Sequence, residues 1–129
     1  MTSAIAALSL PSCIIVPPSA GAGAVRPPPR YSFSGSTLRV RLPVEATVMG
    51  ASIAAERELV RRGYTISKLD RTADFAYITA KAPDHRLVHK ITCRAQREAD
   101  AVYFDFRPFP GDEEFSRSFM AGVLYRLGL

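Results

Sequence analysis

The stretch that decides the fold is AVYFDFRPFPGDEEFSRSFMAGVLYRL, residues 101–127. Apolar and polar side chains alternate from Val102 to Arg107, which is typical of a strand with one buried face. Pro108 and Pro110 follow, and proline has no amide proton to donate to a neighbouring strand. We therefore expect the strand to end at Arg107 and the chain to turn.

A closing helix is predicted after this turn. Asp112 is placed to cap the first turn, and Glu113 and Glu114 suit the positive end of a helix dipole. Apolar residues then recur every three or four positions from Phe115 to Leu127, which predicts one apolar stripe that packs on a sheet. Gly128 is a natural residue to end the helix.

Four more strands and one more helix are predicted before this unit. The helix is expected over residues 44–62 and ends at Gly63. Alternation predicts strands over residues 36–42, 64–69, 75–81 and 85–96. The element order is β-α-β-β-β-β-α, which predicts an α+β two-layer sandwich: a mostly antiparallel sheet with two helices on one face.

Composition indicates a single domain behind a separate N-terminal segment. The chain has 129 residues, of which 47% are hydrophobic, and this suffices for one core. Residues 1–35 hold six of the ten prolines and no acidic residue, which favours a leader and a disordered Pro-, Ala- and Gly-rich linker. We expect the folded domain to span residues 36–129, which contain 15 basic and 12 acidic residues. This excess is modest for a nucleic-acid-binding protein.

The N-terminal segment also resembles a targeting signal. A short apolar run, residues 4–10, leads into Leu10-Pro11-Ser12-Cys13, which resembles the lipobox of bacterial lipoproteins. The resemblance implies that Cys13 is the lipidation site and that residues 14–35 form a tether. We therefore expect a cell-envelope or periplasmic protein that reaches the membrane only through this anchor. A cytoplasmic protein with a disordered tail and an organelle transit peptide are the alternatives.

The sequence predicts no catalytic or metal site. His85 and His89 lack the paired ligands that zinc spacing requires, and no nucleophile or carboxylate partner accompanies them. Cys93 shares the expected core face of its strand with His89, Ile91 and Ala95, so it is predicted to be a buried thiol. We expect no enzyme activity and no cofactor.

The outer face of the sheet is the candidate binding face. Its predicted members are Arg39, Arg41, Tyr77, Lys90, Arg94, Tyr103 and Arg107. Basic residues among tyrosines on an open sheet suit single-stranded nucleic acid. Any exposed antiparallel face also places polar residues outward, and no aromatic RNA-binding motif is present, so nucleic acid is the less favoured partner.

The layout from Leu38 to Leu127 is similar to small bacterial envelope domains of unknown function, often lipoproteins. The matching features are Gly63-Tyr64-Thr65-Ile66 after a helix, and the strand, turn and helix of residues 102–127. The resemblance implies a non-catalytic accessory or assembly role and transfers no functional residue. We therefore expect a structural or protein-interaction module, with nucleic-acid binding as the alternative and with the oligomeric state open.

Overall fold

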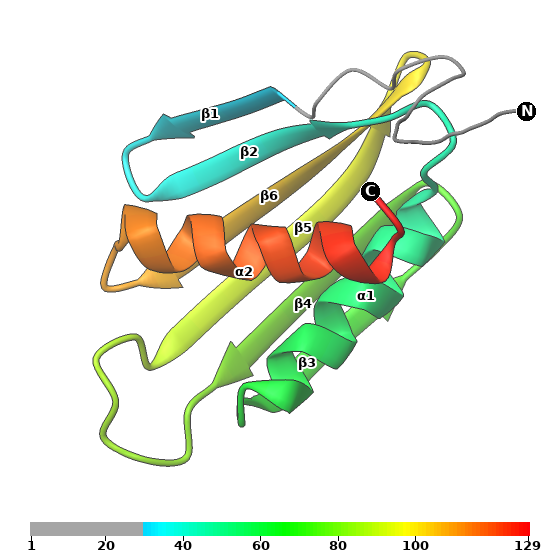
Figure 1. Cartoon of the computed structure of the whole chain (residues 1–129). Coiled ribbons are helices and arrows are strands. Elements are labelled where there is room, and N and C mark those ends of the chain that lie inside the picture. The colour runs from blue at the N-terminus through cyan, green and yellow to red at the C-terminus, as the bar shows by residue number, and fades with distance from the viewer. Residues whose placement is uncertain (1–29) are drawn as a thin grey trace, which may run out of the picture.

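A computed structural model describes residues 30–129 of the chain. Six strands form one antiparallel sheet in the order β1-β2-β6-β5-β4-β3, and two helices pack on the same face of it (Figure 1). The elements are β1 (Arg30–Ser34), β2 (Thr37–Leu42), α1 (Val48–Arg61), β3 (Thr65–Arg71), β4 (Phe75–Lys81), β5 (Lys90–Glu98), β6 (Ala101–Phe109) and α2 (Glu113–Arg126). The predicted α+β two-layer sandwich is confirmed.

The connections leave one face of the sheet uncovered. Strands β3 to β6 follow one another as antiparallel neighbours, while α1 carries the chain from β2 to β3 at the far edge of the sheet. Helix α2 follows β6 and lies beside α1 (Figure 1). Because both helices lie on one side, no element among residues 30–129 covers the opposite side of the sheet (Figure 1).

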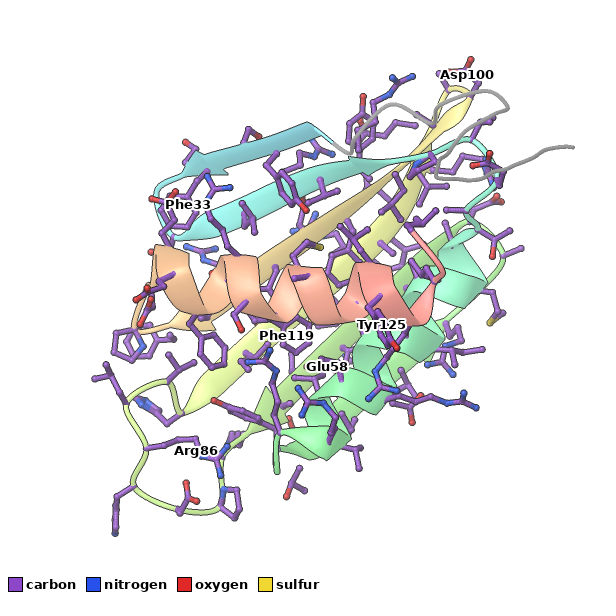
Figure 2. The ribbon with its side chains drawn as sticks, viewed as in Figure 1. Phe33, Glu58, Arg86, Asp100, Phe119 and Tyr125 are labelled. Atoms are coloured by element: carbon purple, nitrogen blue, oxygen red, sulfur yellow. The ribbon has the colours of Figure 1, made fainter. Side chains whose placement is uncertain are left out.

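Aromatic side chains fill the layer between the sheet and the helices. Phe104 and Phe106 of β6 and Phe119 of α2 are the largest fully buried side chains. The Phe106 and Phe119 rings stack with their centroids 4.2 Å apart, and Phe119 is labelled in Figure 2. Burying a side chain of this size stabilises a fold by about 1.5–3 kcal/mol, so the predicted stripe of α2 anchors that helix to the sheet.

The helix ends follow capping chemistry. As predicted, the Asp112 carboxylate accepts a hydrogen bond from the Phe115 amide at 2.9 Å and caps α2. Helix α1 begins at Val48, later than expected, because the Thr47 hydroxyl caps it by accepting from the Gly50 amide at 2.9 Å. The residues before Thr47 form a turn instead of a first helical turn.

Strand β6 runs two residues further than the sequence predicts. It continues through Pro108 to Phe109, and both residues pair in register with β5. The Phe109 carbonyl accepts from the His89 amide, so alternation along the strand points the Pro108 nitrogen toward the other side. The pairing of β2 with β6 stops at Phe106 on that side, and a missing amide proton therefore costs no ladder hydrogen bond.

Strand β1 lies within residues that composition assigns to the linker. Its five residues pair with β2, and Gly35 between the two strands has a φ of 62°, which favours glycine. A five-residue strand with two apolar side chains gives a weak periodic signal. Residues 30–34 form a strand because they pair with β2, which their own weak sequence pattern does not predict.

Candidate functional site: the open face of the sheet

The side of the sheet that the helices leave uncovered is called the open face here. It consists of the outward side chains of β2 to β6. The structure places all seven predicted binding residues on it, because the strand register aligns them in rows: Arg39, Arg41, Tyr77, Lys90, Arg94, Tyr103 and Arg107. One row runs Tyr77, Arg94, Asp105, Arg39 across four strands.

Arg39 is committed to contacts within the fold. Its Nη2 donates to Glu98 Oε2 at 2.7 Å, its Nε lies 3.2 Å from Asp105 Oδ1, and its guanidinium lies 4.4 Å from the centroid of the Tyr103 ring. The hydrogen bond from Arg39 lowers the pKa of Glu98. Burial raises the pKa of Asp105, although the charges of Arg39 and Arg94 oppose the shift. Arg39 and Tyr103 therefore organise the centre of the open face.

Other cations of the open face are not neutralised. Arg41, Lys81, Lys90 and Arg107 are exposed, and within residues 30–129 none of them forms an ion pair. The carboxylates on this face have cationic neighbours, since Glu98 and Asp105 contact Arg39, while Asp70 lies 3.8 Å from Lys68. The open face therefore presents a surplus of positive charge to solvent.

Two exposed phenylalanines complete the open face and were not among the predicted residues. Phe75 at the start of β4 is 39% exposed, and Phe109 at the end of β6 is 61% exposed. Phe109 packs edge-on against His89, with 5.5 Å between ring centroids. Alternation in β4 could have placed Phe75 outward with Tyr77. Phe109 was missed because we expected its strand to end before Pro108.

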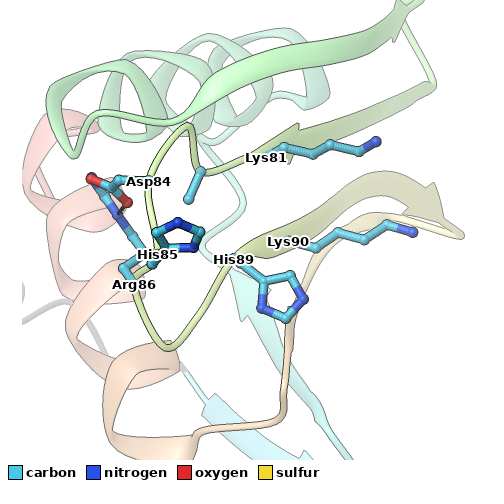
Figure 3. Close-up of a pocket in the computed structure, with 7 residues that line it drawn as sticks. Lys81, Asp84, His85, Arg86, His89 and Lys90 are labelled. Carbon is cyan, nitrogen blue, oxygen red and sulfur yellow. Dashed lines mark hydrogen bonds and ion pairs between the residues drawn. The ribbon is translucent and has the colours of Figure 1, made fainter.

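The two histidines lie in a loop and not on a strand. Strand β5 begins at Lys90, so residues 82–89 connect β4 to β5 (Figure 3). The prediction that His89 faces the core is wrong: its side chain is exposed, and Val88 is buried in its place. An open depression of about 490 Å³ lies here, lined by Lys81, Ala82, Asp84, His85, Arg86, His89 and Lys90.

Arg86 anchors this loop to the rest of the domain. Its guanidinium makes two hydrogen bonds to the Asp84 carboxylate, at 2.7 and 2.8 Å, and another to the Arg62 carbonyl at 2.6 Å. It also lies 4.8 Å from the centroid of the Tyr64 ring. The hydrogen bonds to Arg86 lower the pKa of Asp84, and those to Asp84 raise the pKa of Arg86. Sequence periodicity gives no sign of this anchor.

A second ionic cluster joins the two helices. Glu58 of α1 is 1% exposed and lies between α1 and α2 (Figure 2). It accepts hydrogen bonds from Arg61 at 2.7 Å, from Arg62 at 2.6 Å and from Arg126 at 3.1 Å. Burial alone would raise the pKa of this carboxyl, but the arginines outweigh it and hold the pKa at about 2. Three guanidinium groups share this one carboxylate, and the contact from Arg126 of α2 to Glu58 of α1 links the two helices.

The remaining chemistry-bearing residues do not form a site in the described part of the chain. Cys93 is buried as predicted, and burial raises the pKa of its thiol, which makes it a poor nucleophile. Residues 30–129 contain no cluster of three metal-ligating side chains and no helix that is long and apolar enough to cross a membrane. The proposed lipidation site, Cys13, lies outside the described residues.

Comparison with known proteins identifies no family for this chain. No protein-family model matches the chain, and no curated protein sequence matches it significantly. Function is therefore inferred from the chain's own residues.

Proposed function

We propose that the chain is a non-enzymatic protein-interaction module whose open face meets an acidic surface of its partner. The observation that carries the proposal is the charge imbalance of that face. Arg41, Lys81, Lys90 and Arg107 have no counter-ion among residues 30–129, while the carboxylates beside them are already engaged. Charge complementarity of this kind selects partners and speeds their encounter.

The exposed aromatic rings supply the apolar part of the proposed contact. Phe75 and Phe109 lie on the open face among the free cations. Aromatic side chains are common anchors of protein interfaces because they bury a large area with few rotatable bonds. A partner that covers Phe109 would also lie over the ends of β5 and β6.

Photo-cross-linking in the native cells tests which face meets the partner. A photoreactive phenylalanine analogue replaces Phe109 on the open face, and the control replaces Tyr125 on α2, which is 84% exposed. We expect an adduct with a defined protein from position 109 only. The double change Arg41→Glu and Arg107→Glu should abolish the adduct, while Arg57→Glu on α1 should leave it. Adducts from position 125 alone, or none from position 109, would overturn the proposal.

We further propose that Cys13 carries a lipid anchor that holds the domain in the bacterial envelope. The support is the Leu10-Pro11-Ser12-Cys13 segment and the proline-rich stretch between it and the domain. Metabolic labelling with a palmitate analogue should mark the wild-type chain, and Cys13→Ala should remove the label. An unlabelled wild-type chain, or label retained in the variant, would contradict the anchor.

Single-stranded nucleic acid is the second candidate partner. The observation in its favour is the row that places Tyr77 beside Arg94 on the open face, near the exposed Phe75 ring, because bases stack on aromatic rings while arginine contacts phosphate. Titration of a labelled single-stranded oligonucleotide at low salt tests it. Salt-sensitive binding that Arg94→Glu weakens and Arg57→Glu does not would favour this partner over an acidic protein.

A further inference from the structure

Two lysines oppose each other at one end of the open face. Lys81 of β4 and Lys90 of β5 are cross-strand partners in register, and both are exposed. Figure 3 shows the two side chains extending in the same direction. Directly opposed like charges destabilise an antiparallel pair, and the Cβ atoms at such positions lie only about 4.5–5.5 Å apart. Neither lysine has a counter-ion within residues 30–129.

The surroundings of the pair are depleted of free negative charge. The depression of about 490 Å³ beside the lysines is also lined by His85, His89 and Arg86, and its size falls in the usual range of small-ligand sites. Among its described lining residues the one carboxylate is Asp84, and Arg86 occupies both oxygens of that group. Lys81 and Lys90 line the edge of the depression, and Figure 3 shows their ammonium ends extending away from His85 and His89. An anion in the depression would therefore be met by lysine side chains that turn toward it on their flexible four-carbon stems.

The loop that forms the depression is held in place before any ligand arrives. Arg86 binds Asp84 within the loop, binds the Arg62 carbonyl at the end of α1 and lies on the Tyr64 ring. The Tyr64 hydroxyl in turn donates to the Val88 carbonyl. A fixed loop reduces the ordering cost of binding, so the backbone that carries His85 is held in place by the contacts of Arg86 and Val88.

We propose that this depression, called the lysine-pair site, binds an oxyanion of the phosphate class. Lys81 and Lys90 supply the two point charges by turning their flexible side chains toward the anion, and His85 supplies a ring N–H donor. The bound oxyanion neutralises the repulsion between the lysines. This inference rests on the proposed function, because it treats the open face as a binding surface. It specifies which chemical group is recognised at one end of that face. Inorganic phosphate and the phosphate of a lipid headgroup share this chemistry.

Amide NMR shifts during titration with inorganic phosphate test the site. Sodium chloride at matched ionic strength is the reference. We expect saturable shifts at residues 81–90 and at Phe109. The double variant Lys81→Gln with Lys90→Gln should bind at least about tenfold more weakly, because the loss of one charge-assisted contact alone corresponds to about this factor and the variant removes two. The control is Lys68→Gln on the same face, whose lysine already pairs with Asp70, and it should bind like the wild type.

Thermal unfolding gives a second readout of the lysine-pair site. Phosphate should raise the melting temperature of the wild type more than chloride does, and the double variant should lose this increment. Without phosphate the double variant should melt no lower than the wild type, because it removes a like-charge pair. Shifts spread evenly over the face, or unchanged binding in the double variant, would overturn the site.

Vesicles distinguish the two sources of the oxyanion. The full-length Cys13→Ser chain, which cannot carry the proposed lipid anchor, is sedimented with vesicles of phosphatidylglycerol mixed into phosphatidylcholine, and with phosphatidylcholine alone. Co-sedimentation that requires both lysines and phosphatidylglycerol assigns the site to anionic lipid headgroups, while phosphate binding without it assigns the site to soluble phosphate. If phosphate does not bind but the cross-link from position 109 persists, the lysine-pair site fails and the interaction module stands. If phosphate binds but that cross-link is absent, the lysine-pair site stands and the interaction module fails.

Discussion

Replacing Glu58 by glutamine should destabilise the domain by about 3 kcal/mol at neutral pH. The carboxylate is buried and accepts hydrogen bonds from Arg61, Arg62 and Arg126. Its pKa falls from 4.5 to about 2, and each unit is equivalent to about 1.4 kcal/mol. The resulting figure of about 3 kcal/mol agrees with the usual cost of removing one partner from a buried ion pair. Urea unfolding followed by circular dichroism measures the difference.

The pH dependence of this loss follows from the direction of the shift. The pKa of Glu58 is lower in the folded state than in the unfolded state, so its contribution is complete above about pH 5 and disappears as the pH falls toward 2. The stability difference between wild type and Glu58→Gln should therefore shrink over that range. Taking the difference cancels other acidic groups with lowered pKa values, such as Asp84 and Glu98.

An exposed ion pair provides the matched control. Glu113 and Arg117 form an i,i+4 pair at 2.8 Å on α2, and both side chains are about half exposed. Glu113→Gln should cost less than about 1 kcal/mol, because water screens such pairs. The reasoning fails if Glu58→Gln costs no more than Glu113→Gln, or if its cost is the same at pH 6 and pH 2.5.

Three further outcomes are expected. Gly122→Ala should destabilise the domain by about 1–3 kcal/mol in urea unfolding, because a Cβ there would lie 2.7 Å from the Glu58 carboxylate; in a Glu58→Ala background most of this cost should vanish. Asp112→Ala should cost about 1 kcal/mol through loss of the α2 cap, and Asp112→Asn should restore most of it. In a Cys13→Ser variant, Cys93 should react with a thiol reagent only in denaturant, and reaction at the native rate of an exposed thiol would contradict its burial.

Local patterns determined most of the fold. The alternation from Val102 to Phe106 defines which side of β6 is buried, and the periodicity of α2 identifies the stripe that covers it. Asp112 and Gly128 mark the ends of that helix as predicted. These features depend on residues close together in the chain, because strand alternation and helical periodicity are properties of the backbone itself.

Contacts between residues far apart in the chain determined the features that those local patterns did not predict. Strand β6 continues through Pro108 because its proline nitrogen faces away from β5, and that orientation depends on register with a neighbouring strand. The β4–β5 loop owes its position to Arg86, which reaches Tyr64 and the end of α1. Neither contact leaves a periodic trace in the sequence.

The features of the open face likewise depend partly on local sequence and partly on tertiary structure. The sequence by itself determined that the open face carries Arg41, Arg94 and Arg107, because alternation assigns each strand residue to a side. Only the tertiary structure decided which charges are neutralised, since ion pairing requires two strands to meet in a particular register. That register engages Arg39 with Glu98 and Asp105. It also places Lys81 opposite Lys90, and the pairing of β4 with β5 across their connecting loop brings those two charges together.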